Sequence, residues 1–341
     1  MDVGLLLAGG GTTMSEMVEI AQEAENAGVD SVYIAEAWRS AFVPLAAIAA
    51  GTNRIRIGPH VVNAYGRSPW ITGMSAIDLN ELSGGRLHLC VGTGNKHINA
   101  DWQGIEPERP LKKMEEYATL LKQIVQTRVG ESVSWQGEIH GMEWPPAVEP
   151  QEEAIPVFLA AFYPKMLEVA ARTADGISLG GLLSADYIRN SFRPRAEAAA
   201  AAAGRDPATL QYKMAPFASV DDDVEVARRA TREAICHTFA PLSHPYLAYA
   251  MRESRFADVT DAVADHIADG EFDRACDAIP DRLLDELTIC GTEAQCRDQL
   301  NAFDGLIDEV LLVNVNYSAA TTEGLLPAFR QLIDFAGKPQ I

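Results

Sequence analysis

The chain has 341 residues, of which 48% are hydrophobic, and a formal net charge of −20. This length suits either two domains or one large α/β barrel. The acidic balance excludes proteins that bind nucleic-acid phosphates or anionic membranes through bulk charge. No run of about 18 apolar residues occurs, and no basic segment precedes the short apolar run at the start, so we expect neither a membrane span nor a signal peptide.

The five cysteines are odd in number and form no CxxC pair. A disulfide framework or zinc site is therefore not expected, and a soluble protein of the reducing cytoplasm fits the chain. The histidines show neither HxH nor HExxH spacing, so we predict no metal. Without metal ligands, redox cysteine pairs or a nucleophile motif, redox chemistry would need an organic cofactor.

The first part of the chain alternates between strand and helix patterns. Short apolar runs predict strands over residues 3–7, 31–35, 55–58 and 86–91. Helices are expected over residues 14–27, 69–82 and 111–126, and segment 42–50 connects the second and third strands. Gly28 and the Gly84-Gly85 pair stand where two of these helices should end.

Residues 130–150 break this alternation, and their turn residues predict an inserted hairpin. The alternation then resumes with strands over residues 157–161, 176–179, 212–220 and 309–313 and helices over residues 164–173, 185–203 and 324–335. Residues 221–303 read as a long stretch of extra helices. Eight strands with helical crossovers predict one (β/α)8 TIM-type barrel domain over residues 1–341, with insertions after strand four and between strands seven and eight. A doubly wound sheet is the rival, which the chain-long alternation disfavours.

In such a barrel the chemistry lies at the C-terminal ends of the strands. In this acidic chain, five basic side chains fall there and suggest an anionic ligand, although loops are polar in general. They are Arg39, Arg67, Lys96, His97 and Lys165. Lys165 also fits a solvated position in a helix. The Gly92-Thr93-Gly94 run fits either a tight turn or the close approach of a phosphate or flat ring, and it lacks the third glycine of a Rossmann fingerprint.

Residues 55–94 (IRIGPHVVNAYGRSPWITGMSAIDLNELSGGRLHLCVGTG) resemble the bacterial-luciferase-like superfamily. Further similar segments are residues 21–38 (AQEAENAGVDSVYIAEAW), residues 157–181 (VFLAAFYPKMLEVAARTADGISLGG) and residues 290–312. The resemblance covers nearly the whole chain and is closest to the branch that uses the deazaflavin coenzyme F420. That branch includes methylene-tetrahydromethanopterin reductase and F420-dependent glucose-6-phosphate dehydrogenase.

The resemblance implies a barrel with the cofactor in its mouth, and a homodimer. It implies a non-prolyl cis peptide bond at His60–Val61 behind the deazaflavin ring. Other residues border this ring or line the phosphate-bearing tail. By similarity, the cofactor-binding residues are Glu36, His60, Val61, Asn63, Thr93 and Gly94 around the ring, and Phe162, Tyr163, Lys165, Met166, Gly180 and Gly181 along the tail.

Three departures leave the catalytic residues unassigned. In the sugar-phosphate dehydrogenases a histidine follows the acidic residue after strand two and a glutamate follows the strand-four glycine, but here Ala37 and Asn95 stand there. In the methanopterin reductases a glutamate lies in strand one, where this chain has Leu6. Neither specific activity carries over.

Four side chains remain as candidates for lining the substrate pocket: Trp38, Arg39, Arg67 and His97. The resemblance implies an F420-dependent oxidoreductase that transfers a hydride between C5 of the deazaflavin and an unidentified small organic substrate. An FMN-dependent luciferase-like monooxygenase is one alternative. A non-catalytic deazaflavin-binding protein is the other.

Overall fold

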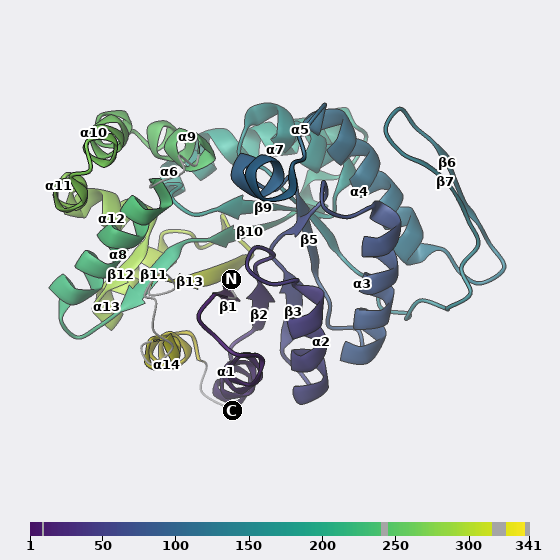
Figure 1. Ribbon diagram of the computed structural model, residues 1–341, viewed down its shortest axis with the longest axis horizontal. Helices are drawn as coiled ribbons and strands as arrows, with labels where there is room; N and C mark the ends of the chain where they lie inside the picture. Colours follow the sequence, from purple (N-terminus) through teal and green to yellow (C-terminus); the bar gives the residue numbers. More distant parts are fainter. Residues whose placement is uncertain (9, 240–244, 316–324, 338–341) are drawn as a thin grey trace.

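A barrel of parallel strands forms the centre of the computed structural model, which describes residues 1–8, 10–239, 245–315 and 325–337 (Figure 1). In sheet order its strands are β3 (Arg56–Pro59), β2 (Ser31–Ile34), β1 (Asp2–Leu7), β13 (Glu309–Asn314), β10 (Gln211–Ala215), β9 (Gly176–Gly180), β8 (Val157–Ala160), β5 (Leu89–Gly92) and β4 (Val62–Asn63). The end members β3 and β4 are two halves of one interrupted strand. Because β3 pairs with β2 and β4 pairs with β5, this strand closes the ring. The predicted barrel is confirmed.

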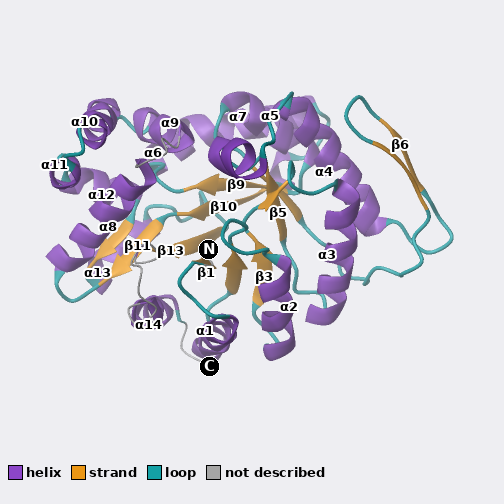
Figure 2. Cartoon of the chain, viewed as in Figure 1, coloured by secondary structure: helices purple, strands orange, loops and turns teal. Residues whose placement is uncertain are grey.

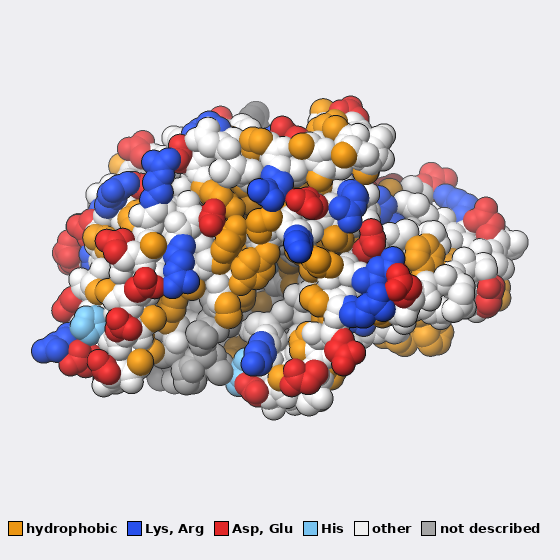
Figure 3. All heavy atoms as spheres, turned by 90° about the horizontal axis from the view of Figure 1, so that it is seen from above, with side chains coloured by type: hydrophobic (Ala, Val, Ile, Leu, Met, Phe, Trp, Pro, Cys, Tyr) orange, Lys and Arg blue, Asp and Glu red, His pale blue; other side chains and the backbone are white. Residues whose placement is uncertain are grey.

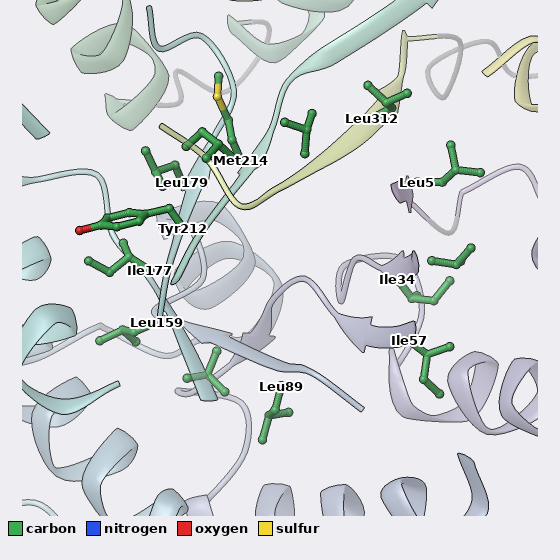
Figure 4. Close-up of a cluster of buried hydrophobic side chains, with 14 of the residues drawn as sticks. Leu5, Ile34, Ile57, Leu89, Leu159, Ile177, Leu179, Tyr212, Met214 and Leu312 are labelled. Carbon is green, nitrogen blue, oxygen red and sulfur yellow. The ribbon is translucent and has the colours of Figure 1, made fainter. Parts of the chain in front are cut away.

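Side chains fill the barrel. Successive residues of a strand point to opposite faces, and the structure sorts them into two groups. Leu5 and Ile34 belong to the main apolar cluster, which also contains buried side chains of the helices around the barrel (Figure 4). Their chain neighbours Leu6 and Tyr33 belong to a separate small cluster with Phe158. The interior of the barrel is therefore packed with side chains.

Helices surround the strands, as Figure 2 shows. They are α1 (Met14–Ala27), α2 (Phe42–Gly51), α3 (Pro69–Ser83), α4 (Pro110–Gln126), α5 (Pro164–Thr173), α6 (Ala185–Tyr187), α7 (Arg193–Ala202) and α14 (Leu325–Ala336). Local sequence signals set their ends. Thr13 and Glu16 form a capping box at the start of α1, and Gly28 ends that helix at a φ of 80°. A π-helical turn, Ile188–Phe192, joins α6 to α7 within the predicted helix 185–203, and a 3₁₀ turn, Pro207–Thr209, precedes β10.

A second group of helices lies between strands seven and eight, at the left of Figure 1. It contains α8 (Val224–Phe239), α9 (Pro245–Glu253), α10 (Ala257–Ala268), α11 (Phe272–Asp277), α12 (Asp281–Leu287) and α13 (Glu293–Asn301). Helices α8 to α12 pack around an apolar cluster of their own, which includes Ile235, Met251 and Leu284. Helix α13 instead contributes Cys296 and Leu300 to the main core.

Two predictions for this region need correction. The stretch 221–303 is not wholly helical, because β12 (Ile289–Gly291) pairs in parallel with β11 (Phe217–Val220). β12 has only three residues, too few to show the alternation of apolar and polar residues that predicts a strand. The single strand predicted over residues 212–220 is broken at Pro216, which has no N–H for the ladder. Its second half, β11, pairs with β12 and with the end of β13.

The predicted hairpin is confirmed as β6 (Val133–Gln136) and β7 (Gly141–Trp144), an antiparallel pair that follows α4. It extends from the body of the protein beyond α4 at the right of Figure 1. The Glu116 carboxylate of α4 accepts hydrogen bonds from the backbone N–H groups of residues 138, 139 and 140, with N–O distances of 2.8 to 3.0 Å. These bonds fix the turn of the hairpin. Although burial raises the pKa of Glu116, these bonds outweigh burial and lower it to about 2.

Acidic and basic side chains are interspersed over the face drawn in Figure 3. No helix in the described ranges has the length and apolar character needed to cross a membrane. All five cysteines are buried and unpaired by disulfides.

Candidate active site

The carboxyl ends of the parallel strands meet at one end of the barrel, which we call the mouth. Glu36 follows β2, Asn63 ends β4, Thr93 follows β5, Phe162 comes after β8 and Gly180 ends β9. The residues predicted to bind a cofactor therefore come from five separate places in the chain to one end of the fold. Active sites of (β/α)8 barrels lie at this end.

A cavity of about 590 Å³ opens in the mouth between the loops that follow β2, β4 and β5. Its volume lies within the range of small-molecule sites. Three of the four residues predicted to contact substrate line it, namely Trp38, Arg39 and Arg67. Glu36 and Asn63, predicted to border the cofactor ring, line it as well.

Glu36 is held by hydrogen bonds on both oxygens. Arg67 donates to Oε1 from Nε at 3.0 Å and from Nη2 at 2.9 Å. The backbone N–H of Asn63 donates to Oε2 at 3.1 Å. Glu36 therefore joins the loop after β2 to the loop after β4.

Asn63 connects the third strand to the segment after β5. Its Nδ2 donates to Oδ1 of Asn99 at 2.7 Å, and Nδ2 of Asn99 donates to the carbonyl oxygen of Thr93 at 2.8 Å. Gly94 has a φ of 65°, and a Cβ there would lie 2.7 Å from Nδ2 of Asn63. Only glycine satisfies both the backbone conformation and this close approach.

The cis peptide bond expected at His60–Val61 is present, between β3 and β4. The His60 imidazole lies inside the barrel, where Nε2 is 2.6 Å from Oγ of Ser178. Burial, and then the ammonium group of Lys213, lower the pKa of His60 to about 4. The imidazole is therefore neutral at neutral pH, and its side chain is committed to the interior. Val61 lies against Gly92, where a Cβ would come 2.9 Å from Cγ2 of Val61.

A buried polar network lies below His60. The Nζ atom of Lys213 contacts the Glu309 carboxylate, donates to the Tyr33 hydroxyl at 2.8 Å and lies 3.1 Å from Nδ1 of His88. Burial alone would raise the pKa of Glu309, but Lys213 and then Arg56 outweigh it and lower the pKa to about 2. Both members of the ion pair are 2% exposed. This charge pair sits in the filled barrel beneath the mouth.

The other half of the mouth, after β8 and β9, is aromatic. Phe162 packs on Tyr246 with ring centres 4.7 Å apart, and Tyr163 packs on Tyr249 at 4.9 Å. A Cβ on Gly180 would lie 2.0 Å from Cζ of Phe162, so glycine makes room for that ring. A Cβ on Gly181 would lie 2.8 Å from the carbonyl oxygen of residue 215.

Lys165, Met166 and His97 are among the predicted residues that do not line the cavity. Lys165 is exposed in the first turn of α5. Met166 belongs to the main apolar core, so its side chain faces away from any ligand at the mouth. His97 pairs through Nδ1 with Asp101 at 2.6 Å and touches the cavity only through the Trp102 ring, 4.9 Å away.

The sequence analysis missed residues in two places. Asn99, Trp102 and Gln103 follow β5 on and just after a π-helical turn, His97–Asp101, which lies between the predicted strand 86–91 and the predicted helix 111–126. The helical spacing of Asn95, Asn99 and Trp102 could have revealed it. Lys213 and Glu309 lie within strands and not at their carboxyl ends, and the alternation of side chains along a strand places them on the inward face.

The family model of luciferase-like monooxygenases matches residues 1–309. The 5,10-methylenetetrahydromethanopterin reductase of Archaeoglobus fulgidus is 28% identical over 281 residues, which cover 82% of each chain. A relative from Mycobacterium tuberculosis, with the provisional name of coenzyme F420-dependent oxidoreductase, is 26% identical over 312 residues that cover 84% of this chain and 86% of the relative.

Solved structures share the fold. The coenzyme F420-dependent tetrahydromethanopterin reductase of Methanopyrus kandleri superposes with a TM-score of 0.82 at 21% identity, over 99% of this chain and 97% of the other. The oxygenating constituent of 3,6-diketocamphane monooxygenase from Pseudomonas putida, in complex with FMN, gives 0.69 at 17% identity, over 99% and 97%. With the family model spanning most of its length, this chain belongs to the luciferase-like monooxygenase family.

Proposed function

We propose that this protein is a coenzyme F420-dependent oxidoreductase that transfers a hydride between the deazaflavin and a small organic substrate. When bound, the deazaflavin supplies the carbon that gives or takes the hydride. Two relatives support this proposal, because one is named as a methylenetetrahydromethanopterin reductase and the other as a coenzyme F420-dependent oxidoreductase. The support from this chain is the shape of its mouth.

The observation that carries the proposal is the close packing of the end of β5 against Val61 and Asn63 beside the cavity. An added Cβ would lie 2.9 Å from Cγ2 of Val61 at Gly92 and 2.7 Å from Nδ2 of Asn63 at Gly94, so only glycine lets these segments approach so closely. Asn63 and Glu36 line the cavity and are fixed by the bonds described above. This edge of the mouth is therefore preorganised, as the binding of a flat tricyclic ring requires.

The start of α5 suits the phosphate-bearing tail. Its N-cap, Tyr163, provides no side-chain hydrogen bond, and the first position is Pro164. The free N–H groups of the first turn and the helix dipole therefore favour an anion there. The exposed ammonium group of Lys165 adds a positive charge at the same place.

A flavin would also fit several of these features, and FMN is bound by a monooxygenase of the same fold. An FMN-dependent monooxygenase is therefore the second candidate. In either candidate Glu36 has a positioning role, since its oxygens accept hydrogen bonds from Arg67 and Asn63.

Titration of the purified protein with F420 and with FMN, followed by fluorescence, tests the proposal. We expect F420 to bind and FMN to bind at least tenfold more weakly. Lys165→Ala should weaken F420 binding about tenfold, as the loss of a charge-assisted phosphate contact predicts. Arg172→Ala, at the far end of α5 and paired with Glu115 on the surface, is the matched control and should not change the affinity.

Tight binding of FMN without binding of F420 would support the monooxygenase and overturn the proposal. Binding of reduced F420 that no panel of electron acceptors reoxidises would favour a non-catalytic deazaflavin-binding protein. If Lys165→Ala and Arg172→Ala bind F420 with equal affinity, the start of α5 does not bind the phosphate-bearing tail.

A further inference from the structure

Two large aromatic side chains are exposed in the lining of the mouth cavity. Trp38 is 64% exposed and Trp102 is 42% exposed. They come from separate elements, the loop after β2 and the segment after β5, yet their ring centres are 4.7 Å apart with the planes inclined at 44°. We call this pair of indole rings the aromatic wall.

Neighbouring groups hold the aromatic wall in place. A Cβ at Gly10 would lie 3.2 Å from the Trp38 ring, so the chain after β1 approaches this ring closely. The His97 ring packs edge-on against Trp102 with ring centres 4.9 Å apart, and Asp101 holds Nδ1 of His97 at 2.6 Å. A flat ring that covers exposed indole surface removes apolar area from water and gains a ring contact. The aromatic wall is therefore suited to a planar, conjugated ligand.

The charged side chains of the cavity have partners within the protein. Glu36, Arg39 and Arg67 are the ionisable groups among its described lining residues. Arg67 is paired with Glu36 at 2.9 Å, and Nη2 of Arg39 donates to the carbonyl oxygen of Thr12 at 2.6 Å. An ionised ligand would have to compete with these bonds and would also lose its own hydration. The cavity therefore favours a ligand without charge.

Two hydroxyl groups in the same cavity can bind a carbonyl oxygen. Ser40 and Ser68 both line it. Oγ of Ser40 accepts from Nη2 of Arg67 at 3.0 Å, and Oγ of Ser68 accepts from the backbone N–H of Ile71 at 3.2 Å. A hydroxyl that accepts in this way still has its O–H to donate, and neither O–H has an acceptor in the part of the chain that the structure describes. Because Arg67 contacts Ser40 and precedes Ser68 in the chain, the two donors lie on one side of the cavity.

We infer that the mouth cavity binds an uncharged, planar, conjugated carbonyl compound, whose ring lies on the aromatic wall and whose carbonyl oxygen accepts hydrogen bonds from Ser40 and Ser68. This names the substrate class for the proposed oxidoreductase and rests on that proposed function for its role as a substrate site. The binding itself follows from the cavity alone. Its volume of about 590 Å³ accommodates a bicyclic ketone.

Calorimetric titration of the protein with three probes tests the ligand class. The probes are 2-acetylnaphthalene, which is planar and neutral, 2-naphthoate, which is planar and anionic, and 2-acetyldecahydronaphthalene, which is neutral and saturated. We expect 2-acetylnaphthalene to bind about tenfold more tightly than either of the others, because the saturated ketone lacks the ring contact and the anion loses its hydration. No measurable binding of 2-acetylnaphthalene up to its solubility limit overturns the inference. Binding of either other probe with equal or higher affinity overturns it as well.

A tryptophan variant assigns the ring contact. Trp102→Leu should lower the affinity for 2-acetylnaphthalene about fivefold and leave that for 2-acetyldecahydronaphthalene unchanged, because leucine keeps apolar area but removes the ring. Trp70→Leu is the matched control, since Trp70 is 40% exposed on α3 but is not among the residues that line the cavity. If Trp70→Leu and Trp102→Leu have the same effect, the aromatic wall is not the binding surface.

A serine variant assigns the carbonyl contact. Ser40→Ala should lower the affinity for 2-acetylnaphthalene about fivefold, as the loss of one hydrogen bond predicts. It should leave the affinity for naphthalene unchanged, because naphthalene has the same rings and no carbonyl group. Ser75→Ala is the matched control, since Ser75 lies on α3 and is not among the lining residues. Equal affinities of Ser40→Ala and Ser75→Ala for 2-acetylnaphthalene would refute the carbonyl contact at Ser40.

Repeating the titration with saturating F420 separates this inference from the proposed function. We expect 2-acetylnaphthalene to bind equally well to the F420-loaded protein. Competition between the two would show that the cavity belongs to the cofactor, and would overturn the substrate assignment while leaving F420 binding intact. Binding of 2-acetylnaphthalene without any F420 binding would overturn the proposed function and support the carbonyl-binding cavity.

Discussion

Arg67 donates two hydrogen bonds to the same carboxylate oxygen of Glu36, from Nε at 3.0 Å and from Nη2 at 2.9 Å. Its Nη2 also donates to Oγ of Ser40 at 3.0 Å, and the guanidinium lies 5.2 Å from the centre of the Phe42 ring. One side chain therefore joins the loop after β4 to the loop after β2. The wall of the mouth cavity depends on this connection.

Arg67→Met should disrupt the mouth. Without the guanidinium, Glu36 keeps only backbone donors in a half-buried position, and we expect the free energy of unfolding to fall by about 1–2 kcal/mol. F420 affinity should fall with it. Chemical denaturation and F420 titration measure the two effects. Arg172→Met, which breaks the exposed pair with Glu115 at 3.3 Å, should cost at most about 0.5 kcal/mol. Wild-type stability and affinity of Arg67→Met would contradict this role.

Gly94→Ala should weaken cofactor binding as well as stability. A Cβ there would lie 2.7 Å from Nδ2 of Asn63, so the Asn63–Asn99 hydrogen bond must shift. Gly104→Ala is the matched control, because Gly104 has a φ of 66° and nothing lies within 4 Å of its added Cβ. Both variants carry the backbone strain of about 1 kcal/mol. Only Gly94→Ala should reduce F420 affinity in fluorescence titrations, and equal affinities of the two variants would refute the contact.

Lys213→Met should destabilise the barrel strongly. It leaves the Glu309 carboxylate, which is 2% exposed, with Arg56 at 3.4 Å as its remaining cation. Breaking a buried ion pair costs about 3–5 kcal/mol, whereas replacing both members by apolar residues costs much less. The double variant Lys213→Met/Glu309→Leu should therefore be more stable than Lys213→Met in denaturant titrations. If the double variant is less stable than Lys213→Met, the ion pair contributes more to stability than the neutralisation of each charge by the other.

The barrel could be predicted from sequence because its signals are local and repeated. Apolar runs such as that of β1 and helix ends such as Gly28 recur along the chain. The exceptions have identifiable causes. Pro216 divides the seventh strand by its missing N–H, and β12 is too short to show a period.

The site was predicted less completely. Glu36 and Asn63 were predicted from the family resemblance, and both line the cavity because the barrel brings strand ends together. Trp102 was not, since its place on the wall depends on the π-helical turn after β5. The orientation of His60 toward Ser178, inside the barrel, depends on packing in three dimensions and not on any spacing in the sequence.

Two histidines should make stability depend on pH. Burial, and then Lys213, lower the pKa of His60 to about 4 and that of His88 to about 3. In the unfolded chain both titrate near 6.5. Below that pH the unfolded state binds protons that the folded state does not, so stability is full above about pH 6.5 and falls as the pH drops toward about 4 for His60 and about 3 for His88.

Each histidine adds a slope of up to about 1.4 kcal/mol per pH unit within its window. Denaturant titrations between pH 7 and pH 4 measure the combined slope. His60→Gln and His88→Gln replace each imidazole by an uncharged amide that can still form hydrogen bonds, so each variant should flatten the curve, and the double variant should flatten it further. The neutral imidazole of His60 contacts Ser178 beneath the mouth, so F420 affinity should be constant over the range where the wild-type protein stays folded. A slope unchanged in the double variant would show that other groups bind the protons on unfolding.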